Sequence, residues 1–221
     1  MIEVLFRARC RCMAATTLLA MASTMAVAGE PSWRDFPGVS NSSFVEPGGD
    51  RALQLSIEIA AAAHEVWTQF ATSDGFASWA APVAHVDLRV GGSIEASYDP
   101  HAKLGDAGNI RNEILAYIPD RLLVIRNSHT PPGFVDAELF QRTVTVIELA
   151  PLTASRTRVT VTNLGYGTGE RYDAVYRHFE WGNAYTLAGL RARFERGPVD
   201  WAAQQQERRE HDAGHEGVAA H

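Results

Sequence analysis

Cysteine is almost absent from this sequence, and its scarcity limits the chemistry open to the protein. The 221 residues contain only two cysteines, Cys10 and Cys12, and both lie near the start. We expect the segment that carries them to be removed. The mature protein would then have no disulfide and no thiolate nucleophile.

Recognisable metal and nucleophile motifs are missing as well. The sequence has no CxxC, HExxH, acidic calcium loop or GxSxG elbow, so we expect no metal, no cofactor and no assigned catalytic residue. Asp99, His101 and Asp106 could together ligate a cation, although a solvated surface loop is the favoured interpretation. The run "NLGYGTGE" is best explained as a tight strand-to-helix connection, because Glu170 stands where a dinucleotide-binding loop requires glycine.

Positive charge is scarce relative to negative charge. The whole chain has 20 basic and 26 acidic residues, a net charge of −6. Removing residues 1–28 takes away three arginines and one glutamate, which leaves 17 basic and 25 acidic residues and a net charge of −8. This balance argues against nucleic acid and against anionic membrane surfaces as partners.

Residues 1–28 have the features of an export signal. Arg7, Arg9 and Arg11 precede the apolar run "MAATTLLAMASTMAVA", and the run ends in a small-x-small cleavage site at 26–28. The run is too short and too rich in small residues for a stable membrane span. We therefore expect a periplasmic or secreted protein without a membrane span after cleavage. Retention of the segment as an anchor is the alternative.

The rest of the chain is predicted to contain one folded domain. Residues 29–50 are rich in proline, glycine and serine and predict an extended leader, whereas residues 202–221 are polar, lack periodicity and predict a disordered tail. Between them, residues 51–201 begin with "RALQLSIEIA", whose period of two is typical of a strand with one buried face. Two short helices, about six further antiparallel strands and one long helix follow. The prediction is an α+β fold.

This order of elements, with four local patterns, resembles the SRPBCC superfamily, the helix-grip fold of the birch pollen allergen and the START domains. The patterns are "AAAHEVWTQFATSDGFASWAAP", "LRVGGSIEASY", "GNIRNEILAYIPDRLLVIR" and the closing "ERGPVDW". Within the superfamily, the chain looks most like the branch related to the C-terminal domain of the heat-shock-90 ATPase activator. The resemblance implies a curved antiparallel sheet of about six to seven strands that wraps around the C-terminal helix and leaves a cavity.

An amide interrupts the buried stripe of that long helix. The stripe contains Phe179, Asn183, Leu187 and Leu190. A buried amide without a partner costs about 1–3 kcal/mol, so Asn183 must bond to a strand residue, a water or a ligand. In the related branch this position is usually tryptophan, which implies that asparagine here enlarges the cavity.

The strand predicted over residues 108–117 has two faces, and the sequence leaves open which one lines the cavity. If Arg111 and Glu113 faced inward, they would form a buried charge pair able to position a proton donor. If the set containing Ile110 and Ile114 faced inward, the two charges would form a pair in water worth less than about 1 kcal/mol. The second arrangement is favoured.

Aromatic residues supply the remaining candidates for a ligand pocket. Trp67 is expected to pack in the core, whereas Tyr176, Phe179 and Asn183 follow one another along the helix and are the best pocket candidates. The complete set of predicted ligand-binding residues is Trp79, Arg111, Glu113, Phe140, Tyr172, Tyr176, Phe179 and Asn183.

Three functions are compatible with these features. The favoured one is an exported module that binds a small, largely apolar or aromatic molecule. The second is a cofactor-free enzyme of the polyketide cyclase type, in which Glu113, Arg111 or Tyr176 assists proton transfer. The third, implied by the resemblance, is a co-chaperone-like interaction module, which an export signal disfavours. The sequence leaves the ligand and the oligomeric state open.

Overall fold

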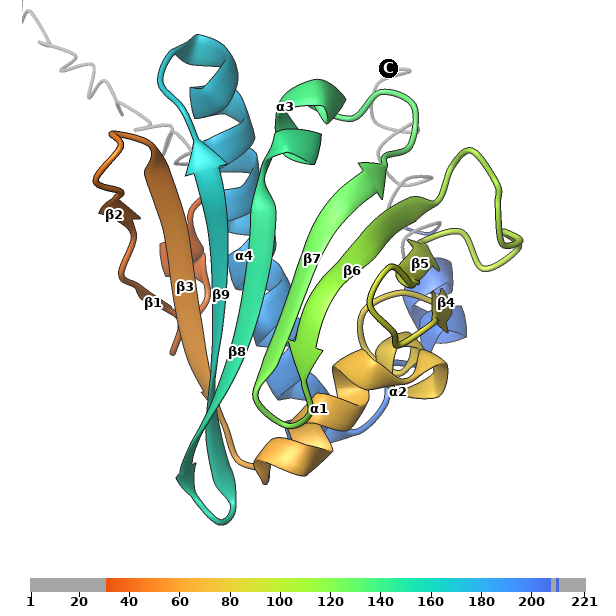
Figure 1. Cartoon of the computed structure of the whole chain (residues 1–221). Helices are drawn as coiled ribbons and strands as arrows, with labels where there is room; N and C mark the ends of the chain where they lie inside the picture. The colour runs from red at the N-terminus through yellow and green to blue at the C-terminus, as the bar shows by residue number, and fades with distance from the viewer. Residues whose placement is uncertain (1–30, 208–209, 211–221) are drawn as a thin grey trace, which may run out of the picture. The chain divides into compact units, whose positions relative to one another are not determined.

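An antiparallel sheet of nine strands forms the body of the protein (Figure 1). The computed structural model describes residues 31–207 and residue 210, so the predicted export signal at 1–28 and most of the predicted tail lie outside the described residues. The strand order is β1-β3-β9-β8-β7-β6-β5-β4, and β2 also pairs with β3. The strands are β1 (Ser40–Asn41), β2 (Phe44–Val45), β3 (Arg51–Ile59), β4 (Val83–Val86), β5 (Ser93–Ser97), β6 (Ile110–Ile118), β7 (Leu122–His129), β8 (Val144–Thr153) and β9 (Arg156–Tyr166).

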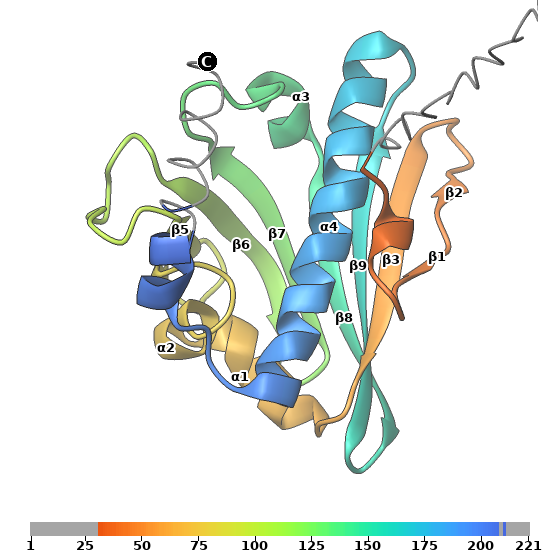
Figure 2. The same ribbon diagram turned by 180° about the vertical axis from the view of Figure 1, so that it is seen from behind.

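One long helix lies along the concave face of this sheet (Figure 2). This helix is α4 (Glu170–Arg196), the long C-terminal helix that the sequence predicts. The short helices α1 (Ala63–Ala71) and α2 (Ser73–Ala77) follow β3 and close one end of the sheet. None of the helices in the described part of the chain is long and apolar enough to span a membrane. The predicted helix-grip architecture is confirmed, but the sheet has nine strands where six to seven were predicted, because the segment before β3 adds β1 and β2.

Strand β3 shows how the sequence pattern produces this architecture. Its alternating residues Leu53, Leu55, Ile57 and Ile59 are all buried. They project to the face that α4 covers, because side chains one residue apart along a strand point to opposite faces. The core therefore forms between the concave face and the helix.

The predicted leader and tail are more structured than the sequence suggests. Residues 31–50 include a short 3-10 helix, η1 (Trp33–Asp35), and the strands β1 and β2, which pair with β3. Residues 201–207 are helical. They are held by Trp201, whose indole N–H donates to the carbonyl of Ala77 at 2.7 Å. Strand pairing and this anchoring bond depend on contacts between distant residues, so a local pattern does not reveal them.

A third short helix was also missed by the sequence analysis. Helix α3 (Ala137–Arg142) lies between β7 and β8, where the sequence analysis predicted no helix. Asp136 caps it by accepting from the backbone N–H of Leu139, and Arg171 on α4 donates two hydrogen bonds to the same carboxylate, at 2.9 and 3.1 Å. Helix α3 is thereby tied to the first turn of α4.

A buried carboxylate holds the long connection between β5 and β6 against the outer face of the sheet. Glu95 on β5 is only 7% exposed and accepts hydrogen bonds from the backbone of Gly105, the amide of Asn109 and the guanidinium of Arg111. Burial alone would raise the pKa of Glu95, but these donors prevail and lower it to about 2. The ionised carboxylate therefore stabilises this loop.

Replacement of this carboxylate should destabilise the fold in a pH-dependent way. Glu95→Gln is expected to lower the free energy of unfolding by about 1.5–3 kcal/mol near pH 7, the range for hydrogen bonds to charged groups. Because folding lowers the pKa of Glu95, the ionised group stabilises the fold above about pH 4.5, and this contribution disappears as the pH falls toward 2. Urea titrations between pH 2.5 and 7 measure the difference.

The matched control is Glu113→Gln on the neighbouring strand, where the side chain is exposed. It should change the free energy of unfolding by less than about 0.5 kcal/mol at every pH. Equal effects of the two substitutions, or a difference for Glu95→Gln that does not narrow in acid, would contradict this account of the loop.

Candidate functional site

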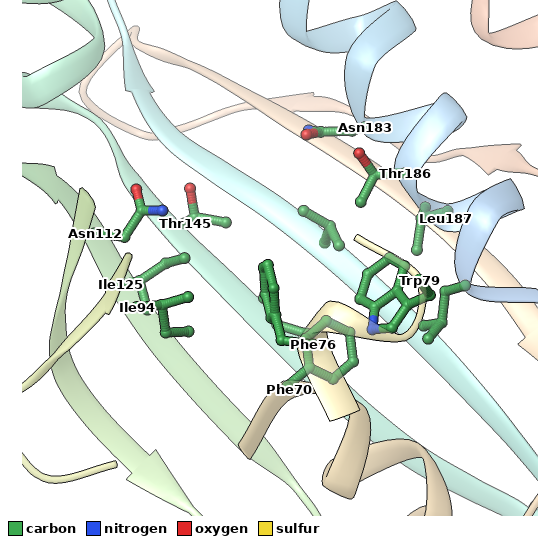
Figure 3. Close-up of a pocket in the computed structure, with 13 residues that line it drawn as sticks. Phe70, Phe76, Trp79, Ile94, Asn112, Ile125, Thr145, Asn183, Thr186 and Leu187 are labelled. Carbon is green, nitrogen blue, oxygen red and sulfur yellow. The ribbon is translucent and has the colours of Figure 1, made fainter. Parts of the chain in front are cut away.

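A cavity of about 150 Å³ lies between α4 and the concave face of the sheet (Figure 3). Its walls come from α1, α2, five strands and the C-terminal half of α4. The lining residues are Phe70, Phe76, Trp79, Ile94, Asn112, Ile125, Thr145, Ile147, Val161, Asn183, Thr186, Leu187 and Leu190.

One end of the cavity is apolar and rigid. Phe70 and Phe76 flank Trp79 with ring centroids at 5.4 and 5.8 Å. The indole N–H of Trp79 donates to the backbone carbonyl of Gln69 at 3.1 Å, which fixes the ring although it is buried. A buried tryptophan with a satisfied N–H provides a flat apolar surface without an unpaired polar atom.

The other end carries all four polar lining residues. Figure 3 shows Asn183 and Thr186 projecting from α4, opposite Asn112 and Thr145 on the sheet. This end is the more accessible one, because Thr186 is exposed, whereas Trp79 and Leu190 are buried. A guest would therefore meet polar groups at the open end and apolar groups at the closed end.

A hydrogen-bonded chain of polar side chains connects α4 to the sheet at this open end. The amide of Asn183 donates to the side-chain oxygen of Asn163 on β9, and the amide of Asn163 donates to the hydroxyl of Thr145 on β8 at 2.7 Å. Asn163 is only 1% exposed. The sequence analysis required a partner for Asn183, and the structure supplies a strand residue.

The cavity is electrically neutral. No ionisable side chain is among its lining residues. Residues 31–207 and 210 also contain no group of three or more histidine, cysteine, aspartate or glutamate residues placed to hold a metal ion. The chemistry available inside the cavity is apolar contact together with neutral hydrogen bonding.

Two of the eight predicted ligand-binding residues, Trp79 and Asn183, line this cavity. Four others lie in aromatic contacts nearer the start of α4. There Phe179 stacks on Phe140 with ring centroids 4.2 Å apart, and Tyr176 meets the buried ring of Tyr166 edge-on at 5.2 Å. Tyr172, also on this part of α4, lies against Gly167. Contact with a ligand stays a prediction for all of these residues.

The predicted charge pair lies outside the cavity. Arg111 donates to Glu95 on the outer face, and Glu113 is exposed, so the inward arrangement of this pair does not occur. Asn112 and Ile114 face inward instead. A bulge between Ile114 and Ala116 then reverses the alternation, which brings Tyr117 onto the inner side, where it stacks on Trp67.

Four polar residues of the site were not singled out from the sequence. Asn112 and Thr145 sit within strands, and Asn163 sits in the run "NLGYGTGE" that we assigned to a connection. Each stands where strand alternation would place an inward side chain, so a polar residue on an inward-facing position was the available signal. Thr186 lies one helical turn from Asn183 and could have been found by the same helical spacing.

A curved antiparallel sheet that encloses a cavity against a long C-terminal helix defines a helix-grip protein of the SRPBCC superfamily. Within it, the family described as "Activator of Hsp90 ATPase homolog 1-like protein" matches residues 60–195. This match spans more than half of the chain, and the chain belongs to that family.

Solved structures show the same fold. The Aha1 dimer of Colwellia psychrerythraea is 19% identical, with 66% of this chain and 97% of that chain covered and a TM-score of 0.52. Protein SSP2350 from Staphylococcus saprophyticus is 13% identical, with coverages of 67% and 96% and a TM-score of 0.51. DynU16, from the dynemicin biosynthetic locus, is 18% identical, with coverages of 66% and 48% and a TM-score of 0.50. At these identities the likeness concerns the fold alone. No curated protein matches the chain.

The bond between Asn183 and Asn163 should appear as an energetic coupling. Asn183→Leu and Asn163→Leu should each cost about 1–3 kcal/mol, because each leaves a polar partner without its hydrogen bond. The double variant should be more stable than the sum of the two effects predicts, by about 0.5–3 kcal/mol. Chemical denaturation of the four proteins in a double-mutant cycle measures this coupling, and strictly additive effects would show that the two amides do not interact.

Proposed function

We propose that the protein binds one small, neutral, largely apolar molecule of about the size of a single ring in the cavity beside α4. The observation that carries the proposal is the cavity itself, which is lined by nine apolar residues and has four neutral polar residues at its open end. An apolar cavity of about 150 Å³ is large enough to admit benzene. The size and the lining together favour a ring-sized guest over a long lipid chain.

Binding is better supported than catalysis. General acid–base chemistry needs a titratable group within hydrogen-bond reach of the reacting atom, and none of the lining residues titrates near neutral pH. Of the three candidates for a cyclase-type reaction, Arg111 and Glu113 lie on the other face of β6, and Tyr176 is not among the lining residues. The structural likeness to DynU16 concerns the fold and supplies no catalytic residue.

Export remains part of the proposal. Its support is the sequence of residues 1–28, with three arginines before an apolar run and a small-x-small site. An exported protein would bind its guest in the periplasm or outside the cell. The family's description also suggests a co-chaperone-like interaction module, which would gain support if the chain were found retained in the cytoplasm.

A small aromatic probe tests the proposal directly. Toluene should shift the indole N–H resonance of Trp79 in a ¹H–¹⁵N spectrum in a saturable way, because this ring forms the closed end of the cavity. The chain has five tryptophans, and Trp181 lies on the exposed side of α4, so its resonance is an internal control that should not move. The absence of a saturable shift at Trp79, or equal shifts at both indoles, would contradict binding in the cavity.

Two substitutions on β8 distinguish an effect of filling the cavity from a general disturbance of the sheet. Ile147→Phe adds atoms to the cavity and should abolish the toluene shift while the protein still unfolds cooperatively. Val146→Phe makes a similar change on the opposite face of the same strand and should leave the shift intact. Loss of binding in both variants would point to a general disturbance of the sheet.

A further inference from the structure

We propose that the guest carries a hydrogen-bond acceptor of the carbonyl type and that the side-chain amide of Asn112 donates to it. This inference rests on the proposed function, because it concerns the chemical class of the molecule in the same cavity. It follows from the way in which the neighbours of Asn112 fix the orientation of its amide.

Asn127, on the adjacent strand β7, determines that orientation. Its amide nitrogen donates to the backbone carbonyls of Arg111 at 3.2 Å and His129 at 3.0 Å. Carbonyl oxygens only accept hydrogen bonds, so the nitrogen of Asn127 must face them. Asn127 is 4% exposed, so the opposite orientation would press its side-chain oxygen against two carbonyl oxygens in a place with little access to water.

The orientation of Asn112 follows from that of Asn127. The same nitrogen of Asn127 also lies 3.3 Å from the side-chain oxygen of Asn112. Asn112 therefore turns its oxygen toward Asn127 and its NH₂ group away from it. Figure 3 shows this nitrogen pointing into the cavity, on the side of Thr145. Within the described residues, the NH₂ group has no acceptor, so the sheet presents a preset N–H donor to the guest.

The chain of side chains from Asn183 to Thr145 has no such fixed direction. If the amides of Asn163 and Asn183 both turned over, Thr145 would donate to Asn163 and Asn163 would donate to Asn183, so every bond of the chain would persist with reversed polarity. This part of the cavity can therefore meet either a donor or an acceptor on the guest. Asn112 therefore distinguishes between guests, because its N–H group favours a guest that carries a hydrogen-bond acceptor.

Charge narrows the class of acceptor. A carboxylate or phosphate in this cavity would be an ion without a cationic partner among the lining residues, which is strongly unfavourable. A ketone, ester or amide carbonyl accepts a hydrogen bond without carrying charge. The geometry therefore points to a neutral, ring-sized molecule with a carbonyl oxygen near one end.

Two probes of the same shape test this inference. Acetophenone and α-methylstyrene differ only in C=O against C=CH₂. Asn112→Leu should weaken the binding of acetophenone relative to that of α-methylstyrene by about tenfold, the equivalent of one hydrogen bond. The ratio of the two affinities is compared between the wild type and the variant because the ketone loses the same hydration on entering either protein. The cost of that dehydration therefore cancels. Calorimetric titration of both probes into the full chain and the variant gives the four dissociation constants.

Thr186→Val is the matched control. The hydroxyl of Thr186 already donates to the carbonyl of Gly182, so this substitution should change the affinities for both probes by the same factor. The infrared carbonyl stretch of bound acetophenone adds a readout that does not depend on affinity. It should lie at lower frequency in the wild-type protein than in Asn112→Leu.

The outcomes separate this inference from the proposed function. A tenfold change in the ratio, with the infrared shift, supports recognition of a carbonyl by Asn112. Binding of both probes with the same ratio in the wild type and Asn112→Leu would overturn the inference and leave the cavity as a binding site. Failure of both probes to bind the wild-type protein would overturn the proposed function and, with it, the inference.

Discussion

The hydrogen bond between Asn183 and Asn163 sets how α4 lies on the sheet. Both amides are removed from bulk water to a large degree, and an unpaired amide in such a place would cost about 1–3 kcal/mol. The helix must therefore approach β9 closely enough for the two side chains to meet. Farther along α4, the sheet curves away, and Leu187 and Leu190 do not fill the space that remains. The cavity is thus a consequence of a polar contact at one point and sheet curvature beyond it.

Charge is arranged around the cavity and kept out of it. Glu95 and Arg111 pair on the outer face, Arg171 ties α3 to α4 through Asp136, and Arg51 pairs with Asp173 at 2.7 Å beside the first turns of α4. These ion pairs hold the loops and helix ends in place. The interior they enclose contains neutral amides, hydroxyls and hydrocarbon, so it can accept a neutral guest without the large penalty of burying an ion.

Local sequence patterns predicted the main elements of the fold but only part of the site. The alternation of Leu53, Leu55 and Ile57 and the helical stripe through Asn183 predicted β3 and α4, because these periodicities directly reflect burial. The faces of β6 could not be followed along its whole length, since the bulge after Ile114 reverses the alternation and depends on pairing with β7.

The polar end of the site shows the same limit. Asn163, Thr145 and Asn112 come from three different strands, and nothing in a single stretch of sequence brings them together. Their proximity to Asn183 depends on strand order and register, which are long-range properties. The aromatic residues Phe140 and Phe179 were plausible pocket residues by type, but they stack on each other and are not among the residues that line this cavity.

The central claim is that an accessible, apolar space exists between α4 and the sheet. The most direct measurement is a crystal structure of the protein under xenon pressure, because xenon enters apolar cavities of this size without needing a polar partner. The account predicts a xenon atom in contact with Phe76, Ile125 and Leu187, between the aromatic end and the polar end of the cavity. A structure in which these side chains have collapsed on one another, with xenon bound elsewhere or not at all, would contradict it.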